Sequence, residues 1–383
     1  MHSQVSIIKC KSYNQLEVYN AIKKAIDFLG GINSFVKKED KVLIKPNLLS
    51  ASTPESGIVT HPEFVRAAVR LVKETGAEIF LGDNPSVWGT PEDVEGVYEV
   101  SGIKRIAEEE KINLIKLNRS ILVNGYALSE YLKMCSCIIS LPKFKTHDLM
   151  TLTGAIKNLF GMVPGLSKTQ LHRQALDSAS FAKILVDIYE LTKPKLSIID
   201  GIVAMEGDGP AAGGTLRDMN LVLAGSDAVS LDSILALIMG LKPEDILTTK
   251  EAKERGLGNA ELKDFEIFGE NLEDFITPDF KLPQTHFLNK MPKPILKTLK
   301  KLVRFYPKID NDLCKMCEIC AKSCPVGAIS KRPQNMRIEY NRCIYCFCCQ
   351  EVCPHAAVKV KKSFFTKIAS GIYHVYSHYR LGK

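Results

Sequence analysis

The sequence predicts an α/β fold, with an open and mostly parallel sheet flanked by helices, followed by a small α+β domain rich in cysteine. Short apolar runs alternate with helical patterns through the first 285 residues, which is typical of such a sheet. Short stretches of polar residues follow several of the apolar runs, and eight cysteines form two matching groups between residues 314 and 353. We therefore expect an α/β domain over residues 1–285 and a cysteine-rich domain over residues 306–361.

The individual strands and helices follow from the apolar patterns. Five short runs are expected to be strands: 41–45, 78–82, 137–141, 196–200 and 220–225. We expect three helices. The first begins at a capping box of Thr60 and Glu63, with Pro62 in its first turn, and ends at Gly76. The second covers roughly residues 181–191 and ends before Pro194, and the third runs from Asp227 to about Met239 and is closed by Gly240. These helices fit between the predicted strands.

Polar residues lie just beyond the predicted strand ends. Open α/β sheets bind ligands in the crevice outside the carboxyl ends of their strands. The residues expected to line one cleft there are Lys45, Asn47, Asp83, Lys143, Lys145, His147, Asp200 and Asp227. The lysines among them, together with Lys157, would suit a ligand that carries a carboxylate or a phosphate. The alternative for each single lysine is a solvated side chain on a loop.

Lys157 and His147 are the candidates for catalysis. Lys157 precedes Asn158 in an apolar stretch that ends in FGMVPG, and a buried lysine has a lowered pKa and can act as an acid or a base. Asn158 is therefore included among the ligand-binding candidates. His147 lies in the densest polar segment, where an imidazole can move a proton or bind a metal. The alternatives are a lysine that snorkels from a helix and a histidine that only packs; His61, at a helix start, is explained by capping.

A glycine-rich stretch over residues 200–214 brings three carboxylates close together in the sequence. Asp200, Glu206 and Asp208 can hold a hard cation there, and the amides of the glycines can cradle an anion. The alternative is a mobile surface loop. The spacing matches neither a P-loop nor the G-x-G-x-x-G dinucleotide motif, and no G-x-S-x-G or H-E-x-x-H motif indicates a hydrolase.

The cysteines follow the pattern C-x2-C-x2-C-x3-C-P twice, the second copy 29 residues after the first. Thiolates at this spacing are what a 4Fe-4S cluster needs, and the fourth cysteine of each run ligates the other cluster. We expect one cluster on Cys314, Cys317, Cys320 and Cys353, and the other on Cys343, Cys346, Cys349 and Cys324. Structural zinc is the alternative, because paired C-x2-C is also zinc-ligand spacing. Cys348 is surplus; it is either a small buried thiol, as Cys10, Cys135 and Cys137 are expected to be, or a replacement ligand in a damaged cluster.

The two halves of the cysteine-rich segment also match outside the cysteines. Ile309 and Ile338 each lie five residues before the first cysteine, and an Ala-Ile or Ala-Val pair follows each Cys-Pro pair. The segment resembles a bacterial-type two-cluster ferredoxin, which implies two 4Fe-4S clusters and one-electron transfer.

Several phrases of the first domain are long and unusual: KPN (45–47), THP (60–62), GDNP (82–85), KTH (145–147), TGAIKNLFGMVPG (153–165), MEGDGP (205–210) and AGSDAVSLD (224–232). Together they resemble the domain-of-unknown-function family 362 over most of residues 5–270. Members of that family often carry a C-terminal two-cluster ferredoxin segment, as this chain does. The resemblance implies the architecture and supplies no established substrate.

Charge is divided unevenly along the chain. From residue 290 to the end there are 19 Lys and Arg against 5 Asp and Glu, whereas the whole chain carries +8. Two basic amphipathic segments bracket the cysteine-rich domain, a linker helix over 286–305 and a tail over 362–383. They can pack on the protein, lie on an anionic membrane surface, or dock an acidic redox partner protein. Nucleic acid is disfavoured as a partner, because no recognition module accompanies the basic residues.

The setting follows from the cysteines and from the absence of long apolar stretches. No stretch has the length of a signal peptide's apolar region or of a membrane span. Thiolate ligands must stay reduced to hold iron, so we expect a cytoplasmic and anaerobic setting, with or without peripheral membrane contact.

These observations indicate an iron–sulfur electron-transfer protein or oxidoreductase, whose ferredoxin segment passes single electrons to an anionic ligand or cofactor in the α/β cleft. One alternative is a non-catalytic ferredoxin whose α/β domain docks a partner enzyme. The other is a factor for metallocofactor assembly or reductive activation, with a further metal held by Asp200, Glu206, Asp208 and His147.

Overall fold

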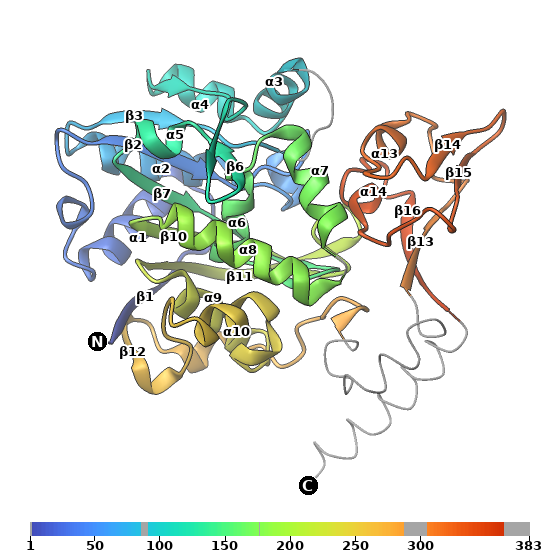
Figure 1. The fold of residues 1–383 in the computed structure, drawn as a ribbon. Helices are drawn as coiled ribbons and strands as arrows, with labels where there is room; N and C mark the ends of the chain where they lie inside the picture. The colour runs from blue at the N-terminus through green and yellow to red at the C-terminus, as the bar shows by residue number, and fades with distance from the viewer. Residues whose placement is uncertain (1, 86–90, 176, 287–304, 364–383) are drawn as a thin grey trace, which may run out of the picture.

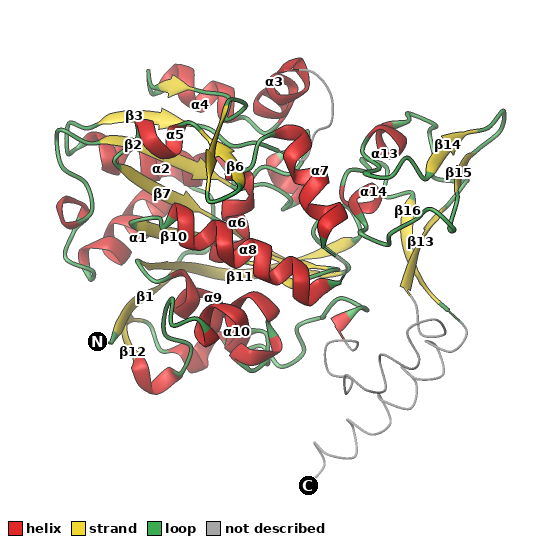
Figure 2. Ribbon diagram, viewed as in Figure 1, coloured by secondary structure: helices red, strands yellow, loops and turns green. Residues whose placement is uncertain are grey.

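The computed structural model describes residues 2–85, 91–175, 177–286 and 305–363 of the chain. Its main body is a ten-stranded mixed sheet with helices on both faces, and the cysteine-rich domain lies to one side of this body (Figures 1 and 2). The order of strands in the sheet is β12-β1-β11-β10-β7-β2-β3-β4. Off this path, β8 pairs with β10, and β9 pairs with β8. Every neighbouring pair from β10 to β4 is parallel, so the expected mostly parallel sheet is confirmed.

All five predicted strands are present. The strands of the main sheet are β1 (Ser3–Lys9), β2 (Lys41–Pro46), β3 (Glu78–Leu81), β4 (Asn113–Leu114), β7 (Cys137–Leu141), β8 (Lys143–His147), β9 (Thr151–Thr153), β10 (Leu196–Gly207), β11 (Gly214–Gly225) and β12 (Phe265–Gly269). A separate hairpin joins β5 (Ser120–Val123) to β6 (Tyr126–Ser129). Strands β10 and β11 exceed the predicted runs, because they pair antiparallel with each other as far as Gly207 and Gly214. The glycine-rich stretch over residues 200–214, for which a mobile surface loop was the alternative, is therefore largely a hairpin.

Helices cover both faces of the sheet. They are α1 (Gln15–Asp27), α2 (Pro62–Lys73), α3 (Pro91–Val100), α4 (Ile103–Glu109), α5 (Tyr131–Met134), α6 (Ala155–Asn158), α7 (Gly165–Gln174), α8 (Ser178–Thr192), α9 (Ala228–Ile238) and α10 (Leu247–Glu254). Short 3-10 turns occupy Ile32–Ser34, Pro54–Ser56, Leu159–Met162, Pro243–Asp245, Leu262–Asp264 and Leu272–Phe275. The apolar faces of α1 and α2 pack in one buried core, and those of α8 and α9 pack in a second. Apolar residues on both faces of the strands are thereby removed from water.

The predicted helix boundaries need one correction. Helix α2 is capped by His61, whose Nδ1 accepts from the amide of Glu63 at 3.2 Å. Thr60 was expected to do this, but its hydroxyl donates to the carbonyl of Leu141 at 2.7 Å. The predicted start of α9 is confirmed, because Asp227 accepts from the amides of its first turn. Helix α8 begins before the predicted residue 181, at a cap formed by Asp177.

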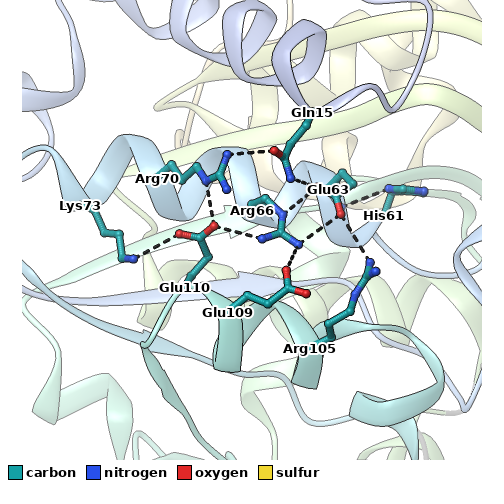
Figure 3. A network of polar contacts seen from close by, with 9 residues as sticks. All are labelled: Gln15, His61, Glu63, Arg66, Arg70, Lys73, Arg105, Glu109 and Glu110. Carbon is teal, nitrogen blue, oxygen red and sulfur yellow. Dashed lines mark hydrogen bonds and ion pairs between the residues drawn. The ribbon is translucent and has the colours of Figure 1, made fainter.

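An ion-pair network fixes α2 against the neighbouring helix α4 (Figure 3). Arg66, which is 4% exposed, donates to Glu63, Glu109 and Glu110, and Arg70 adds a 2.8 Å bond to Glu110. Burial raises the pKa of the Glu110 carboxyl, but Arg70, Lys73 and Arg66 lower it overall. Because both partners are held from several sides, α2 presents its N-terminus at a fixed place above the sheet.

The cysteine-rich domain is built from two similar halves. Its strands and helices are β13 (Phe305–Ile309), α13 (Ile319–Lys322), β14 (Ile329–Lys331), β15 (Met336–Ile338), α14 (Cys348–Glu351) and β16 (Val358–Lys362). Strand β13 pairs antiparallel with β16, and β14 with β15. The matching apolar residues Ile309, Ile338, Ile329 and Val358 share one core, as their repeated positions indicate. The expected small α+β domain is confirmed.

The two predicted basic segments lie almost entirely outside the described residues. These are the linker helix over 286–305 and the tail over 362–383. Within the described part of the chain, no helix combines the length and the apolar character that crossing a membrane requires.

Candidate functional site

The first element of the candidate site is an ion pair at the carboxyl ends of β2 and β3. Lys45 is fully buried, and its Nζ lies 2.7 Å from Oδ1 of Asp83. Oδ1 of Asn158 accepts from Lys45 Nζ at 3.3 Å and from Nδ2 of Asn47 at 3.1 Å. Gly161 permits this packing, because a Cβ there would lie 2.1 Å from Asp83 Oδ1 and 2.5 Å from Lys45 Nζ. The structure therefore brings four predicted residues together under the FGMVPG segment.

A second buried ion pair joins β8 to β10. Lys143 and Asp200 are opposite one another in the strand register, and Nζ lies 2.9 Å from Oδ2. Tyr13 donates to Asp200 at 2.7 Å and accepts from Lys143 at 2.6 Å, and the amide of His61 donates to Asp200 at 3.0 Å. Burial lowers the pKa of Lys143, although the Asp200 charge opposes this shift. The fixed N-terminus of α2 thus supplies one of the donors that hold Asp200.

Three further lysines form no ion pair with any carboxylate of the described residues. Lys145, 1% exposed, donates to the carbonyl of Ile58 at 2.5 Å. Lys168, 4% exposed, donates to the carbonyl of Asn84, and half-buried Lys157 lies on α6. Burial lowers the pKa of all three, to about 7 for Lys168 and well below the usual range for Lys145. We refer to Lys45, Lys143, Lys145, Lys157 and Lys168 as the lysine cluster.

His147 meets the cysteine-rich domain beside the lysine cluster. Its Nδ1 accepts from the amides of Leu149 and Met150 at 3.1 and 3.3 Å, so the ring proton resides on Nε2. Nε2 lies 3.1 Å from Oε1 of Glu351, which ends α14. Burial and Lys157 lower the pKa of His147 to about 4, so the imidazole is neutral near pH 7. A carboxylate of one domain therefore contacts a neutral histidine of the other.

Helix α6 is positioned by a buried carboxylate that the sequence argument did not single out. Asp232 accepts from the amides of Ala155 and Ile156 at 2.6 and 3.2 Å, and a Cβ on Gly154 would lie 2.1 Å from its Oδ1. Burial raises the pKa of Asp232 to about 7. The phrase AGSDAVSLD thus places a cap under the helix that carries Lys157.

Three predicted carboxylates do not join this site. Asp227 caps α9 and also accepts from Ser3 and Asn259, so its oxygens are used there. Glu206 pairs with Arg217 at 3.0 Å and with Lys281 at 3.3 Å. Asp208 accepts from the amide and side chain of Gln284. The reason is local: each carboxylate is satisfied by a neighbour that the spacing of the motifs does not reveal. Among the described residues, these carboxylates and His147 form no metal-binding group.

The expected open cleft is a packed cluster instead. Lys45, Lys143 and Lys145 are at most 1% exposed, because α6, the 159–162 turn and α14 lie against them or their neighbours. His172, on α7, packs between the rings of Phe160 and Phe181. His61 caps α2 in place of Thr60 and contacts the site through its amide, which donates to Asp200.

Besides Asp232, three members of the site were not predicted from the sequence. Tyr13 lies in a loop before α1 and carries no motif. Lys168 lies on α7, just after the FGMVPG phrase, and its position in an otherwise polar helix gave no sign of burial. Glu351 belongs to the other domain, and no local pattern reveals a contact between domains.

The cysteines line two separate hollows in the C-terminal domain. One is lined by Cys314, Cys317, Cys320 and Cys353, which we call the first quartet; the other is lined by Cys324, Cys343, Cys346 and Cys349, the second quartet. The cavity volume is about 10 Å³ in the first and about 20 Å³ in the second, and most of the other lining residues are apolar. Four thiols around an apolar hollow suit an iron–sulfur cluster, and the grouping agrees with the crossed pairing expected from the spacing. Cys348 is buried beside the second quartet, and Cys10, Cys135 and Cys137 are buried in the α/β domain.

Comparison with known proteins matches both parts of the chain. The family described as domain of unknown function (DUF362) matches residues 42–236, and the 4Fe-4S dicluster domain matches residues 306–354. A thylakoid-associated protein of Synechocystis sp. is 33% identical over 291 residues, which span 74% of this chain and 89% of that protein.

The other relatives match the C-terminal domain alone. The pyruvate synthase subunit PorD of Methanocaldococcus jannaschii is 40% identical over 60 residues, 15% of this chain and 70% of that protein. Subunit I of the NADH-quinone oxidoreductase of Pelobacter propionicus is 34% identical over 62 residues, 13% of this chain and 33% of that protein. The C-terminal domain is thus a ferredoxin-type iron–sulfur electron-transfer domain.

Proposed function

The chain belongs to the family described as domain of unknown function 362, and from this premise we propose that it is an iron–sulfur oxidoreductase whose α/β domain holds an anionic ligand. When bound, the two 4Fe-4S clusters supply single electrons for that ligand. The first and second quartets would ligate them. The lysine cluster would bind the ligand.

The observation that carries this proposal is helix α14. Its four residues include Cys349, a member of the second quartet, and Glu351, which lies 3.1 Å from His147 beside the lysine cluster. The second quartet and the basic cluster therefore lie on either side of one turn of helix. A ligand held by the lysines would be close to the group that delivers electrons.

The charge of the cluster supports an anion as the ligand. Five lysines face two internal carboxylates, Asp83 and Asp200, and the carboxylate of Glu351 from the other domain. Buried charges are costly unless they are paired, and burial lowers the pKa of each of these lysines. A carboxylate or phosphate group would supply the missing negative charge and restore the lysines to their charged form.

We assign proton movement to Lys157 and orientation of the ligand to His147. Burial lowers the pKa of Lys157, and its helix is held in place by Asp232, so its Nζ gives up a proton more readily than that of an exposed lysine. His147 keeps its proton on Nε2, because two backbone amides occupy Nδ1. It would orient an anionic group by donating from Nε2.

Titration calorimetry of the anaerobic, iron-loaded chain with inorganic phosphate tests the proposal. We expect Lys145→Met and Lys157→Met each to weaken phosphate binding about tenfold or more, since each removes a charge from the anion. Lys41→Met is the matched control, because Lys41 is half exposed and its 3.7 Å pair with Glu78 lies away from the cluster. Equal affinities for all three variants would contradict the proposal.

We also propose that the basic segments at 286–305 and 362–383 contact an anionic surface, either a membrane or an acidic redox partner. Two observations support this proposal: the net positive charge of both segments, and the thylakoid association in the name of the Synechocystis relative. Removal of residues 364–383 should reduce co-sedimentation with anionic vesicles. Unchanged co-sedimentation would contradict the membrane part of this proposal.

A further inference from the structure

Glu351 is an unusual carboxylate for an electron-transfer domain. It is 6% exposed, although it belongs to the small domain and ends a helix of four residues. Its Oε1 lies 3.1 Å from His147 Nε2, and no hydrogen bond of good geometry satisfies that oxygen within the described residues. A buried carboxylate in this position needs positive charge nearby.

That positive charge comes from the other domain. Burial lowers the pKa of Lys145, Lys157 and Lys168, whereas the charge of Glu351 raises the pKa of each. Burial likewise lowers the pKa of His172, whereas the charge of Glu351 raises that pKa. The carboxylate thus acts on all three lysines that lack an internal carboxylate partner. It stands where we place the anionic ligand.

The neighbouring contact of α14 does not depend on charge. Nε2 of Gln350 donates to the carbonyl of Asp208 at 3.2 Å, and a Cβ on Gly213 would lie 3.2 Å from that nitrogen. The helix therefore touches the β10–β11 hairpin through Gln350 and His147, beside the lysine cluster, through Glu351. Loss of the Glu351 contact would leave the Gln350 contact in place.

We propose that Glu351 is a built-in substitute for the ligand: its carboxylate occupies the anion position of the lysine cluster until an anionic ligand displaces it. The inference rests on the anion site put forward above and adds the regulation of that site. Displacement would place the ligand two residues from Cys349, next to the second quartet. The domain itself would stay in contact through Gln350.

Competition of this kind is reciprocal, so removal of the internal anion must strengthen binding of the external one. Glu351→Gln keeps the size of the side chain and removes its charge. We expect this variant to bind inorganic phosphate about tenfold more tightly than the unchanged chain, within the usual range of coupling between two sites. Glu351→Ala provides a second variant with the same expected direction.

The matched control lies in the other half of the domain. Glu318 is an exposed carboxylate that pairs with Lys331 at 2.6 Å, so Glu318→Gln should leave phosphate affinity unchanged. Hydrogen exchange gives a second readout. Saturating phosphate should increase exchange in residues 348–352 and leave residues 319–323 unaltered, because only α14 loses a contact. Visible absorbance verifies that each variant keeps its clusters.

The outcomes separate this inference from the proposed function. One outcome is that Lys145→Met weakens phosphate binding, but Glu351→Gln and Glu351→Ala bind phosphate no more tightly than the unchanged chain. The anion site is then supported, and the proposal that Glu351 occupies it is wrong. If phosphate binds to no variant and to the unchanged chain neither, both proposals are wrong. Tighter binding in both Glu351 variants, with an unchanged Glu318→Gln control, is the expected result.

Discussion

The two halves of the ferredoxin domain carry the same cysteine pattern in different surroundings. Helix α13 and helix α14 hold equivalent positions, 29 residues apart. In α13 the last residue is Lys322, which is exposed, and in α14 it is Glu351, which is buried against His147 beside the lysine cluster. The first residue differs in the same sense: Ile319 is 39% exposed and Cys348 is 4% exposed.

The difference indicates that one repeated motif can surround a cluster in both halves and also form a contact between domains in one of them. The cysteine spacing requires only that thiols surround each hollow, and both halves meet this requirement. The other helix positions are free to vary, and in α14 they form the contact with the α/β domain. We infer that the first quartet, whose Cys317 is exposed, faces an external redox partner. In the proposed function, the second quartet would face the ligand.

Reversal of the charge at the last residue of each helix should have the largest effect on the difference between α13 and α14. Glu351→Lys would add a further positive charge among Lys145 and Lys157, at a cost of about 3–5 kcal/mol for a buried unpaired charge. We expect α14 to leave the α/β domain, seen as faster hydrogen exchange in residues 348–352. Lys322→Glu is exposed and should leave residues 319–323 unchanged. Similar responses in the two halves would contradict the assigned difference.

The pH dependence of phosphate binding should sharpen the comparison on the α14 side. Lys168 faces Asp83, Lys45, Lys157 and Glu351, and burial lowers its pKa to about 7. Below that pH Lys168 is already charged, so it takes up no proton on binding and does not make the affinity depend on pH. Above it the free amine must take up a proton when the anion binds, so affinity should fall by up to about tenfold per pH unit.

The control for this prediction is Lys168→Met, measured by calorimetry between pH 6 and 9. The variant removes the group that takes up the proton, so its affinity should vary less steeply with pH than that of the unchanged chain. Profiles of equal slope would show that Lys168 does not titrate with the ligand.

Charge changes on the α13 side should have the smallest effect. Lys322→Glu places a negative charge next to the first quartet, where we expect an acidic partner to approach. Stopped-flow reduction by an acidic electron donor should slow by a few-fold at low salt and recover at high salt, because rim charges mainly affect association rates. Phosphate affinity should stay constant. A change in affinity with no change in rate would reverse the roles of the two halves.

The sequence predicted those parts of the molecule that depend on local patterns. Strand β2, the crossed cysteine quartets and the cap at Asp227 all follow from short-range spacing, and the structure has them as expected. Lys45, Asp83, Lys143 and Asp200 were predicted to line one cleft, because parallel strands bring their carboxyl ends together. The ion pairs that join Lys45 to Asp83 and Lys143 to Asp200 were not predicted.

The remainder depends on contacts between distant segments. His61 replaces Thr60 as a cap, since the hydroxyl of Thr60 is needed by Leu141 on the neighbouring strand. Glu206 was a metal-ligand candidate until Arg217 and Lys281 were found beside it. Glu351 lies 204 residues from His147, and only the assembled domains place them in contact.

The most direct test is a search for phosphorus hyperfine coupling in the reduced, iron-loaded chain with saturating inorganic phosphate, by electron–nuclear double resonance. The account predicts a coupling that survives Cys320→Ser, which disrupts the first quartet, and disappears in Cys349→Ser, which disrupts the second. A coupling that survives Cys349→Ser, or no coupling in the unchanged chain when calorimetry shows phosphate bound, would contradict an anion site beside the second quartet.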